Sequence, residues 1–354
     1  MNSVIRLVVL VSMSLVAGCA TSGPRKPPVV IPSEQPAVDV LPVEPVKTEP
    51  VVEVTPPVVD DVEPVVEAEP AVPFRTMVAV QAALDRSNFS CNAIDGELSE
   101  RMRDVLRTWQ DIRGLPVTGE VDEPTLNRVG DIESQFMKYE VTAEDHAALT
   151  DHPSSWRQRA VRKRLGFATI LELVAEKHNC AEETIRRMNP GLDWPNPPAG
   201  SLVDVPRVKP AKWVEAARLE ISLSKRQLKG YDADNRLVLF FPCSIAKDVA
   251  KRPVGDLKIV NAASDPIYTF DPAVFPEDPE AQQMTVKLVI PPGPNNPVGV
   301  AWLSLDRPGY GIHGTAWPED IGKTESHGCF RLANWNAAKL VKMVKLGTPV
   351  KVME

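Results

Sequence analysis

The chain has 354 residues, of which 43% are hydrophobic and 25% are charged, a length and composition that allow about two or three compact domains. Its formal net charge is -7, so it has no basic excess. Proteins that bind nucleic acid carry a strongly basic surface. We therefore exclude nucleic acid as a partner and expect a multidomain protein.

The N-terminus reads as a secretory signal. Arg6 precedes an apolar run over residues 7–15, which is too short to span a membrane comfortably. Small residues then lead directly to Cys19 in the stretch VAGC. This stretch resembles the bacterial lipobox, in which the cysteine becomes the lipid-modified first residue of the mature protein.

We expect residues 1–19 to be a lipoprotein signal peptide, with a plain signal peptide as the alternative. Lipidated Cys19 would anchor the chain to a membrane, with its bulk on the periplasmic side of the cell envelope. Ala20 follows where an inner-membrane retention signal would carry Asp. The outer membrane is therefore favoured.

Residues 20–75 are rich in proline, valine and glutamate. Each proline fixes φ and removes a backbone donor, so we expect a disordered, polyproline-like tether. At about 3 Å per residue it could reach on the order of 100 to 150 Å. A proline-rich ligand for a partner domain is the alternative, without a feature that supports it.

Residues 76–131 have the pattern of a small helical domain. Ser99 and Asp122 can each cap a helix, and Gly114 suits the end of the first one. Apolar residues on one face of that first helix are Met102, Val105, Leu106, Trp109 and Ile112. The motifs AIDG, Trp109-Gln110 and GLPVTG, in this order, resemble the three-helix peptidoglycan-binding domain. A generic helical bundle is the alternative.

Residues 132–164 show helix-like patches and no recognisable chemistry, so we expect a connecting segment. His146 and His152 lie there among polar residues, and we interpret both, like His178 further on, as surface histidines.

Residues 165–208 combine two short helices with a β-type run at 202–205. Thr169 can cap the first helix, and Asn189-Pro190 ends the second. With a strand at each end this pattern resembles the LysM βααβ module, which implies binding to glycan strands that contain N-acetylglucosamine. The module's usual Gly-Asp is replaced here by Phe167-Ala168.

From residue 212 to 354 the sequence has the character of β-strands. ARLEISLS alternates, and RLVLFFPCSI is a nearly continuous apolar run that contains Cys243. One helix is expected in NWNAAKLVKMVKLG, capped by Asn334 and ended by Gly347, with Ala338, Val341 and Val344 on one face. We expect a β-rich sandwich, sheet packed on sheet, with Cys243 in its core.

The cysteines other than Cys19 are scattered and form no CxxC pair. A disulfide framework is therefore not expected. A bridge between Cys91 and Cys180 stays open as an alternative to two small buried thiols, which we favour.

One cysteine has histidines nearby. Cys329 lies in SHGCFRL, and His313 lies upstream in YGIHGT. A thiol with an ordinary pKa of about 8.5 needs an imidazole to become a nucleophile, and His313 and His327 both qualify by type. The carbonyl of Gly314 could hold the other ring nitrogen of His313. The backbone N–H groups of Gly328 and Cys329 could receive an oxyanion.

The stretch IHGTAWPEDIGKTESHGCFRLANW, with PPGPNNPVGVAWLSL upstream, resembles the YkuD-like L,D-transpeptidase catalytic domain over about residues 215–353. The resemblance implies that Cys329 is the nucleophile, His313 the base and Gly314 the carbonyl that holds it. It further implies a scaffold and oxyanion site at Ser326, His327 and Gly328, and substrate contacts at Arg331 and Tyr310. Phe330 and Arg252 are mild departures from the family pattern.

The resemblance also implies a reaction. The thiol would cleave the bond between residues three and four of a peptidoglycan stem peptide and form a thioester. An amine would then take the acyl group, giving a 3-3 cross-link, exchange of a D-amino acid or attachment of a protein. With water as acceptor the enzyme would be an L,D-carboxypeptidase. No cofactor and no metal are implied.

The expected chain is thus a multidomain α+β protein with a three-helix domain, a LysM-like module and a β-rich sandwich catalytic domain. Two rival interpretations remain. A structural zinc site would use two histidines and Cys329 but lacks a fourth ligand at useful spacing. A catalytically inactive lipoprotein tether would use only the wall-binding modules.

Overall fold

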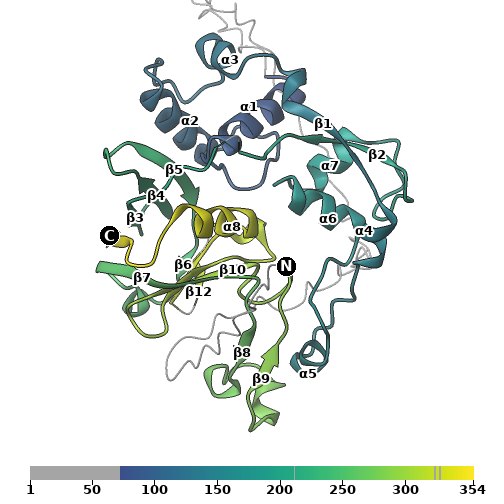
Figure 1. The fold of residues 1–354 in the computed structure, drawn as a ribbon, viewed down its shortest axis with the longest axis vertical. Helices are drawn as coiled ribbons and strands as arrows, with labels where there is room; N and C mark the ends of the chain where they lie inside the picture. The colour runs from purple at the N-terminus through teal and green to yellow at the C-terminus, as the bar shows by residue number, and fades with distance from the viewer. Residues whose placement is uncertain (1–71, 211, 323, 327) are drawn as a thin grey trace, which may run out of the picture. The chain divides into compact units, whose positions relative to one another are not determined.

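The computed structural model describes residues 72–210, 212–322, 324–326 and 328–354 (Figure 1). The expected signal peptide, Cys19 and nearly all of the tether lie outside the described residues. Helix α1 (Phe74–Arg86) includes the last two residues of the expected tether. None of the helices in the described ranges is both long and apolar enough to cross a membrane.

The first region is helical, with α1 followed by α2 (Glu100–Ile112) and α3 (Glu123–Val129). The expected caps are confirmed, because Ser99 Oγ accepts a hydrogen bond from the Met102 N–H at 3.2 Å and the Asp122 carboxylate accepts one from Thr125 at 2.9 Å. Ile112, expected on the buried face of α2, is 38% exposed because it is the last residue of the helix.

The second region contains a two-stranded sheet, whose strands are far apart in the sequence, and several small helices. Strand β1 (Phe136–Glu140) is antiparallel to β2 (Leu202–Pro206), which confirms the strand expected at 202–205. Between them lie the helices α4 (Ala143–Ala147), α5 (Trp156–Ala160), α6 (Ile170–Lys177) and α7 (Glu182–Met188). The expectation of helix-like structure is wrong for β1, because its pairing across about sixty residues leaves no local periodic signal.

The histidines of this region differ in exposure. His178 is buried, its Nδ1 lies 3.1 Å from the carbonyl oxygen of Pro206, and its ring meets the Tyr139 ring edge to face. The surface interpretation is therefore wrong for His178, and burial lowers the pKa of its imidazole. His152 is exposed as expected, whereas His146 is half-buried.

The third region is built on one eight-stranded mixed sheet with the order β13-β11-β10-β7-β14-β3-β4-β5. These strands are β3 (Arg218–Ser222), β4 (Gln227–Tyr231), β5 (Leu237–Pro242), β7 (Gly255–Ser264), β10 (Ala301–Leu305), β11 (Gly311–His313), β13 (Phe330–Arg331) and β14 (Pro349–Met353). Two small ladders join β6 (Ile245–Ala246) with β12 (Thr324–Ser326), and β8 (Tyr268–Phe270) with β9 (Leu288–Ile290).

The large sheet is curled. Ser244, just after the edge strand β5, forms a bridge with Arg331 in the opposite edge strand β13. The expected sandwich of two packed sheets is therefore replaced by one sheet whose edges approach each other. Alternating apolar residues predict a buried face for each strand, but not whether the strands share one ladder. Cys243 lies in the core that the sheet encloses, as expected.

Helix α8 (Asn334–Met343) packs on this sheet. Ala333, and not Asn334, is its N-cap, and the helix ends before Gly347. Its buried apolar residues are Trp335, Ala337, Leu340 and Met343, so the face expected from Ala338, Val341 and Val344 is wrong. The error arises because the neighbouring buried positions are polar, which in a helix usually marks the solvent side.

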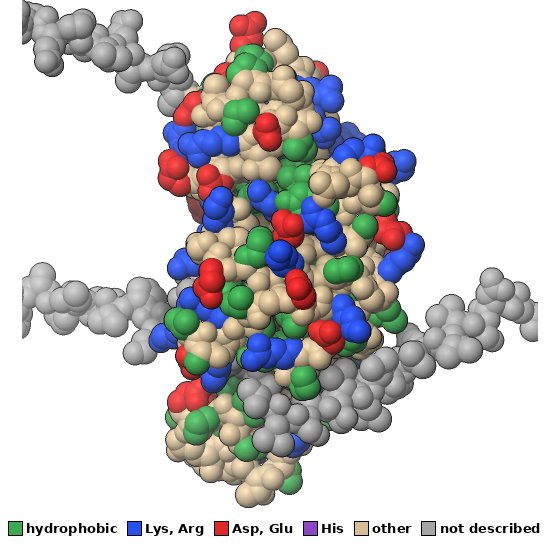
Figure 2. Space-filling model, turned by 90° about the vertical axis from the view of Figure 1, so that its left-hand side faces the viewer, with side chains coloured by type: hydrophobic (Ala, Val, Ile, Leu, Met, Phe, Trp, Pro, Cys, Tyr) green, Lys and Arg blue, Asp and Glu red, His purple; other side chains and the backbone are tan. Residues whose placement is uncertain are grey.

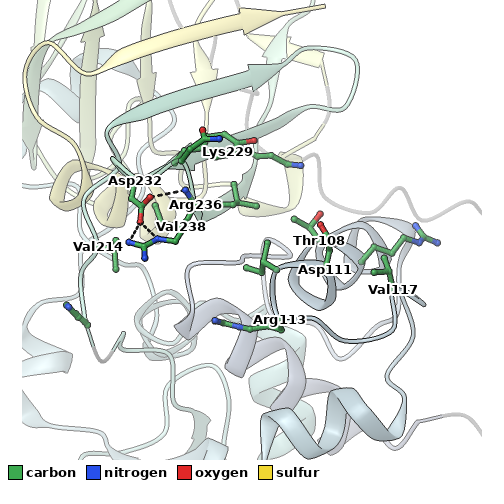
Figure 3. A pocket seen from close by; sticks show the side chains of 15 residues that line it. Thr108, Asp111, Arg113, Val117, Val214, Lys229, Asp232, Arg236 and Val238 are labelled. Carbon is green, nitrogen blue, oxygen red and sulfur yellow. Dashed lines mark hydrogen bonds and ion pairs between the residues drawn. The ribbon is translucent and has the colours of Figure 1, made fainter.

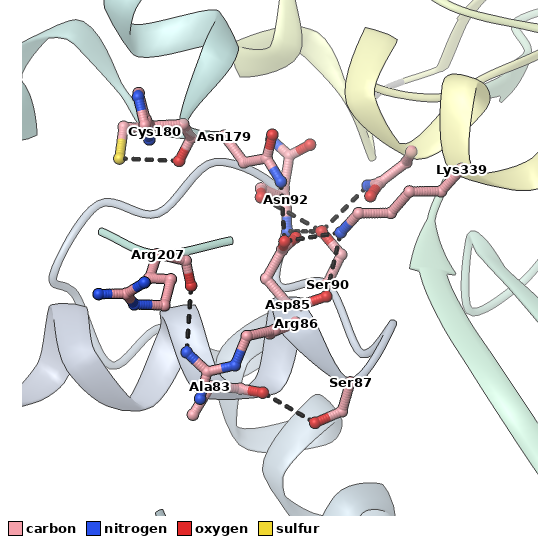
Figure 4. Close-up of polar contacts among 12 residues, drawn as sticks. Ala83, Asp85, Arg86, Ser87, Ser90, Asn92, Asn179, Cys180, Arg207 and Lys339 are labelled. Carbon is pink, nitrogen blue, oxygen red and sulfur yellow. Dashed lines mark hydrogen bonds and ion pairs between the residues drawn. The ribbon is translucent and has the colours of Figure 1, made fainter. Parts of the chain in front are cut away.

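These polar residues of α8 meet the N-terminal region in a buried network (Figure 4). Lys339 Nζ donates to Asp85 Oδ1 at 2.6 Å, and the two side chains are only 6% and 1% exposed. Asn179 Nδ2 donates to the same carboxylate oxygen at 2.7 Å, and Asn336 Nδ2 donates to Ser90 Oγ at 3.0 Å. The network thus joins α1, the turn between α6 and α7, and α8.

Cys91 and Cys180 are both buried and free, which confirms the expectation of two thiols. Burial raises the pKa of each thiol.

We predict that Lys339→Met lowers the free energy of unfolding by about 3–5 kcal/mol, because it leaves the buried Asp85 carboxylate without its cation. Lys342→Met, on the exposed side of the same helix, should cost less than about 1 kcal/mol. Urea unfolding at neutral pH measures both. Equal losses in the two variants would show that the ion pair does not hold the regions together.

Candidate active site

The site lies where strands β11 and β13 run side by side. They pair in parallel, with Ile312 opposite Phe330 and His313 opposite Arg331. The N–H of Leu332 donates to the carbonyl oxygen of His313 at 2.8 Å. Cys329 directly precedes β13, so this pairing brings its backbone beside β11. Two motifs that are separate in the sequence therefore meet at one edge of the sheet.

The imidazole of His313 is fully buried and held from two sides. Its Nδ1 lies 2.7 Å from the carbonyl oxygen of Gly314, and its ring stacks on Trp302 with centroids 5.5 Å apart. A carbonyl can only accept, so Nδ1 carries the proton and Nε2 of the neutral ring keeps its lone pair. This is the tautomer that a general base needs if Nε2 faces the reacting proton.

Cys329 is fully buried in an apolar cluster. Aromatic members of the cluster include Trp156, Tyr268, Phe270, Phe275 and Trp302. Its Sγ lies 3.7 Å from the carbonyl oxygen of Gly309, a weak sulfur contact. Apolar surroundings disfavour a thiolate. A reaction at this sulfur therefore depends on a nearby group that takes the proton.

The residues expected to form the oxyanion site are described only in part. Ser326 is the last residue of β12, which pairs in parallel with β6. Gly328 is buried, directly before Cys329. His327 lies outside the described residues.

The two expected substrate contacts differ in position. Arg331 is buried opposite His313, and its backbone exchanges hydrogen bonds with Ser244 at 3.0 and 2.9 Å. Tyr310 lies in the main core with Leu305 and Ile312. Since residues along a strand alternate between faces, Tyr310 belongs to the face opposite His313. Its place in the core does not fit the substrate contact that we expected.

Asn334 was interpreted as a helix cap, but its side chain braces the loop beside His313. Its Oδ1 accepts from the Val300 N–H at 3.1 Å, and its Nδ2 donates to the Pro294 carbonyl at 3.0 Å. A Cβ added at Gly314 would lie only 2.3 Å from Asn334 Oδ1. Glycine is therefore required at the position whose carbonyl holds the imidazole. No local pattern identifies this role, because Asn at a helix start is read as a cap.

The second region supports the same loop. Asn295 Nδ2 donates to the Gly166 carbonyl at 2.8 Å and to the Glu172 carboxylate at 2.6 Å. Glu176, also on α6, forms a hydrogen bond with the side chain of Asn334, and burial of its carboxyl raises its pKa to about 8. The loop that precedes β10 is thus held by α6 of the second region at Asn295 and by Asn334 of α8 at Val300.

Comparison with known proteins identifies two parts of the chain. Residues 216–352 match the YkuD family, described as "L,D-transpeptidase catalytic domain", and residues 76–129 match a family described as "Putative peptidoglycan binding domain".

Individual relatives match about half of this chain. "Putative L,D-transpeptidase YkuD" of Bacillus licheniformis is 30% identical over 182 residues, which are 51% of this chain and 92% of the relative. "Probable L,D-transpeptidase YbiS" of Escherichia coli is 27% identical over 190 residues, 53% of this chain and 61% of the relative.

Among solved structures, L,D-transpeptidase 3 from Mycobacterium tuberculosis with a faropenem-derived adduct has a TM-score of 0.32 and 19% identity. The match covers 44% of this chain and 75% of that one. The relative from Bacillus licheniformis is matched over nearly its whole length, and the catalytic-domain match contains both His313 and Cys329. The chain therefore belongs to the YkuD family of L,D-transpeptidases, enzymes that act on the peptidoglycan of the cell wall.

Proposed function

We propose that Cys329 is the nucleophile of this L,D-transpeptidase and that His313 is its general base. The observation that carries the proposal is the 2.7 Å contact between His313 Nδ1 and the Gly314 carbonyl, on a strand paired with the one that Cys329 precedes. That contact leaves Nε2 to accept a proton. The apolar surroundings of the thiol make this proton transfer necessary for attack.

In the first half-reaction, Cys329 Sγ attacks the carbonyl carbon of stem residue three, and its proton passes to His313 Nε2. The backbone N–H groups of Gly328 and Cys329, together with His327, would stabilise the oxyanion. The C–N bond to residue four then breaks. The leaving amine takes the proton from His313, and a thioester remains on the sulfur.

In the second half-reaction, an amine loses a proton to His313 and attacks the thioester, and the sulfur leaves and regains its proton. The acceptor amine decides between a 3-3 cross-link, D-amino acid exchange and attachment of a protein. Water as acceptor would give an L,D-carboxypeptidase. Because Cys329 is fully buried, the stem peptide has to displace atoms around the thiol to reach it.

We also propose the arrangement in the cell envelope that the sequence indicates. Lipidation of Cys19 would anchor residues 20–75 as a tether, preferably at the outer membrane and on its periplasmic side. Residues 76–131 would bind peptidoglycan, as the family match over 76–129 supports.

The segment 132–164 would connect this domain to a LysM-like module at 165–208 that binds glycan strands. Strand β2 and helices α6 and α7 support this assignment, although the partner strand β1 lies within the connecting segment. Residues 212–354 would then form the catalytic domain, supported by the family match over 216–352.

We predict that Cys329→Ala and His313→Ala each reduce release of D-Ala from a disaccharide-tetrapeptide by at least about 1000-fold. Mass spectrometry of the products measures the loss and identifies the acceptor used by the native chain. Cys243→Ala is the matched control, because burial in the core raises the pKa of that thiol to about 12 and the site does not use it. Full activity of Cys329→Ala would refute the assignment. An inactive native chain would favour the tether without catalysis.

A second prediction concerns the carbonyl that orients the base. Gly314→Ala should lower kcat by about 10–100-fold, because the new Cβ would meet Asn334 Oδ1 and displace the Gly314 carbonyl. Gly191→Ala is the control, since no atom lies within 4 Å of its added Cβ. Steady-state kinetics and circular dichroism should be compared for both variants. An unchanged kcat in folded Gly314→Ala would show that this carbonyl does not orient the base.

A further inference from the structure

A groove lies between helix α2 and the β4–β5 hairpin, with a volume of about 940 Å³ (Figure 3). Its walls come from the two matched domains, because Thr108, Asp111 and Arg113 lie on α2 or at its end, whereas Lys229 and Val238 lie on β4 and β5. None of the residues of β11 or β13 lines it. The groove is therefore separate from the candidate active site.

The lining is basic although the chain as a whole is acidic. It contains five basic side chains and two carboxylates, in a chain of net charge -7. The basic residues are Arg107, Arg113, Lys212, Lys229 and Arg236. On the side of the molecule where α2 and the hairpin lie, Lys and Arg side chains are interspersed with acidic and hydrophobic ones (Figure 2). The lining itself therefore carries an excess of positive charge.

Two of the five cations are already paired. Arg236 forms an ion pair with Asp232 at 2.8 Å, and Arg107 forms one with Asp104 at 3.1 Å. Arg113, Lys212 and Lys229 form no ion pair with any residue in the described ranges. These three cations remain available for an anion in the groove.

One of the available cations is partly removed from water, because Lys229 is half-buried, whereas Arg113 and Lys212 are exposed. Burial, and then repulsion by Arg128, lowers the pKa of Arg113; burial, and then repulsion by Lys225, lowers that of Lys229. A carboxylate bound at Lys229 would form a charge-assisted hydrogen bond in partial shelter from solvent, and Arg113 and Lys212 would add positive charge to the same groove. This favours an anionic ligand over a neutral one.

Apolar side chains lie beside these cations. Ile112 and Val117 are 38% and 53% exposed in the groove, and Val214 and Val238 complete this part of the lining. Exposed aliphatic groups next to cations suit a short peptide that carries both methyl groups and carboxylates. A stem peptide of alanine and acidic residues has this chemistry.

We propose that this groove binds the carboxylate-bearing stem peptide of peptidoglycan at a second site, away from Cys329 and His313. The proposal rests on the proposed function, because it takes the wall polymer as the ligand of both matched domains. A stem held between α2 and the hairpin would keep the wall strand on the enzyme while a neighbouring stem reacts at the active site.

The test measures binding to the full chain carrying Cys329→Ala, which prevents turnover. The probe is N-acetylmuramyl-L-alanyl-D-glutamate, which lacks stem residues three and four and so offers no bond to the active site. Isothermal titration calorimetry compares this probe with its diamide. Arg113→Glu/Lys229→Glu should weaken binding at least about 10-fold, and the diamide should bind the unaltered groove at least about 10-fold more weakly.

The control Lys163→Glu/Lys247→Glu makes the same charge change at exposed positions outside the lining and should leave affinity unchanged. The pair Arg113→Lys/Lys229→Arg keeps both positive charges and should weaken binding less than the charge reversal does. If the charge reversal does not fold, as judged by its melting temperature, Arg113→Gln/Lys229→Gln replaces it.

Any of three results would refute the proposed stem-peptide site in the groove. These are equal affinity of the charge-reversed and control chains for the probe, equal affinity of the groove for the probe and its diamide, or displacement of the probe by an equal concentration of succinate. Release of D-Ala from a disaccharide-tetrapeptide by the native chain tests the proposed function separately. An active native chain without groove binding would refute only the second site.

Discussion

The hydrogen bond from His313 Nδ1 to the carbonyl oxygen of Gly314 is the constraint on which the rest of the site depends. It selects the tautomer of a buried imidazole whose ring also stacks on Trp302. The carbonyl can take this position only while residue 314 lacks a side chain, because Asn334 Oδ1 occupies the space. Asn334 is fixed in turn by the backbones of Val300 and Pro294.

This constraint extends beyond the catalytic sheet through helix α8. Asn334 stands at the start of α8, and Lys339 on the same helix makes the buried ion pair with Asp85 of α1. The α6 residue Glu176 contacts Asn334 itself. The helix that braces the base is therefore held by both preceding regions of the chain. The second region also contacts the loop beside His313 directly, through the hydrogen bonds of Asn295 to Gly166 and Glu172.

Local features could be predicted from the sequence, and long-range ones could not. The caps at Ser99, Asp122 and Thr169 are confirmed because each depends on a side chain and a backbone N–H only three residues apart. The pairing of β1 with β2, the single curled sheet and the polar buried face of α8 all depend on partners distant in sequence. The resemblance to the family motif predicted that His313, Gly314 and Cys329 belong to one catalytic site.

Spacing alone could not choose the base. His327 and Cys329 are two residues apart and would share a face in an extended segment, so alternation does not exclude His327. The parallel pairing of β11 with β13 places His313 on the strand next to the one that Cys329 precedes, and no local pattern encodes this pairing.

The most direct test of the central claim is a mass measurement on the covalent intermediate. The native chain is mixed with a disaccharide-tetrapeptide, quenched in acid within one turnover, digested and mapped. We expect a disaccharide-tripeptide acyl group on the peptide that contains Cys329, with one D-Ala released per adduct, and a strongly reduced adduct in His313→Ala. An adduct on another residue, or release of D-Ala without any adduct on Cys329, would contradict it.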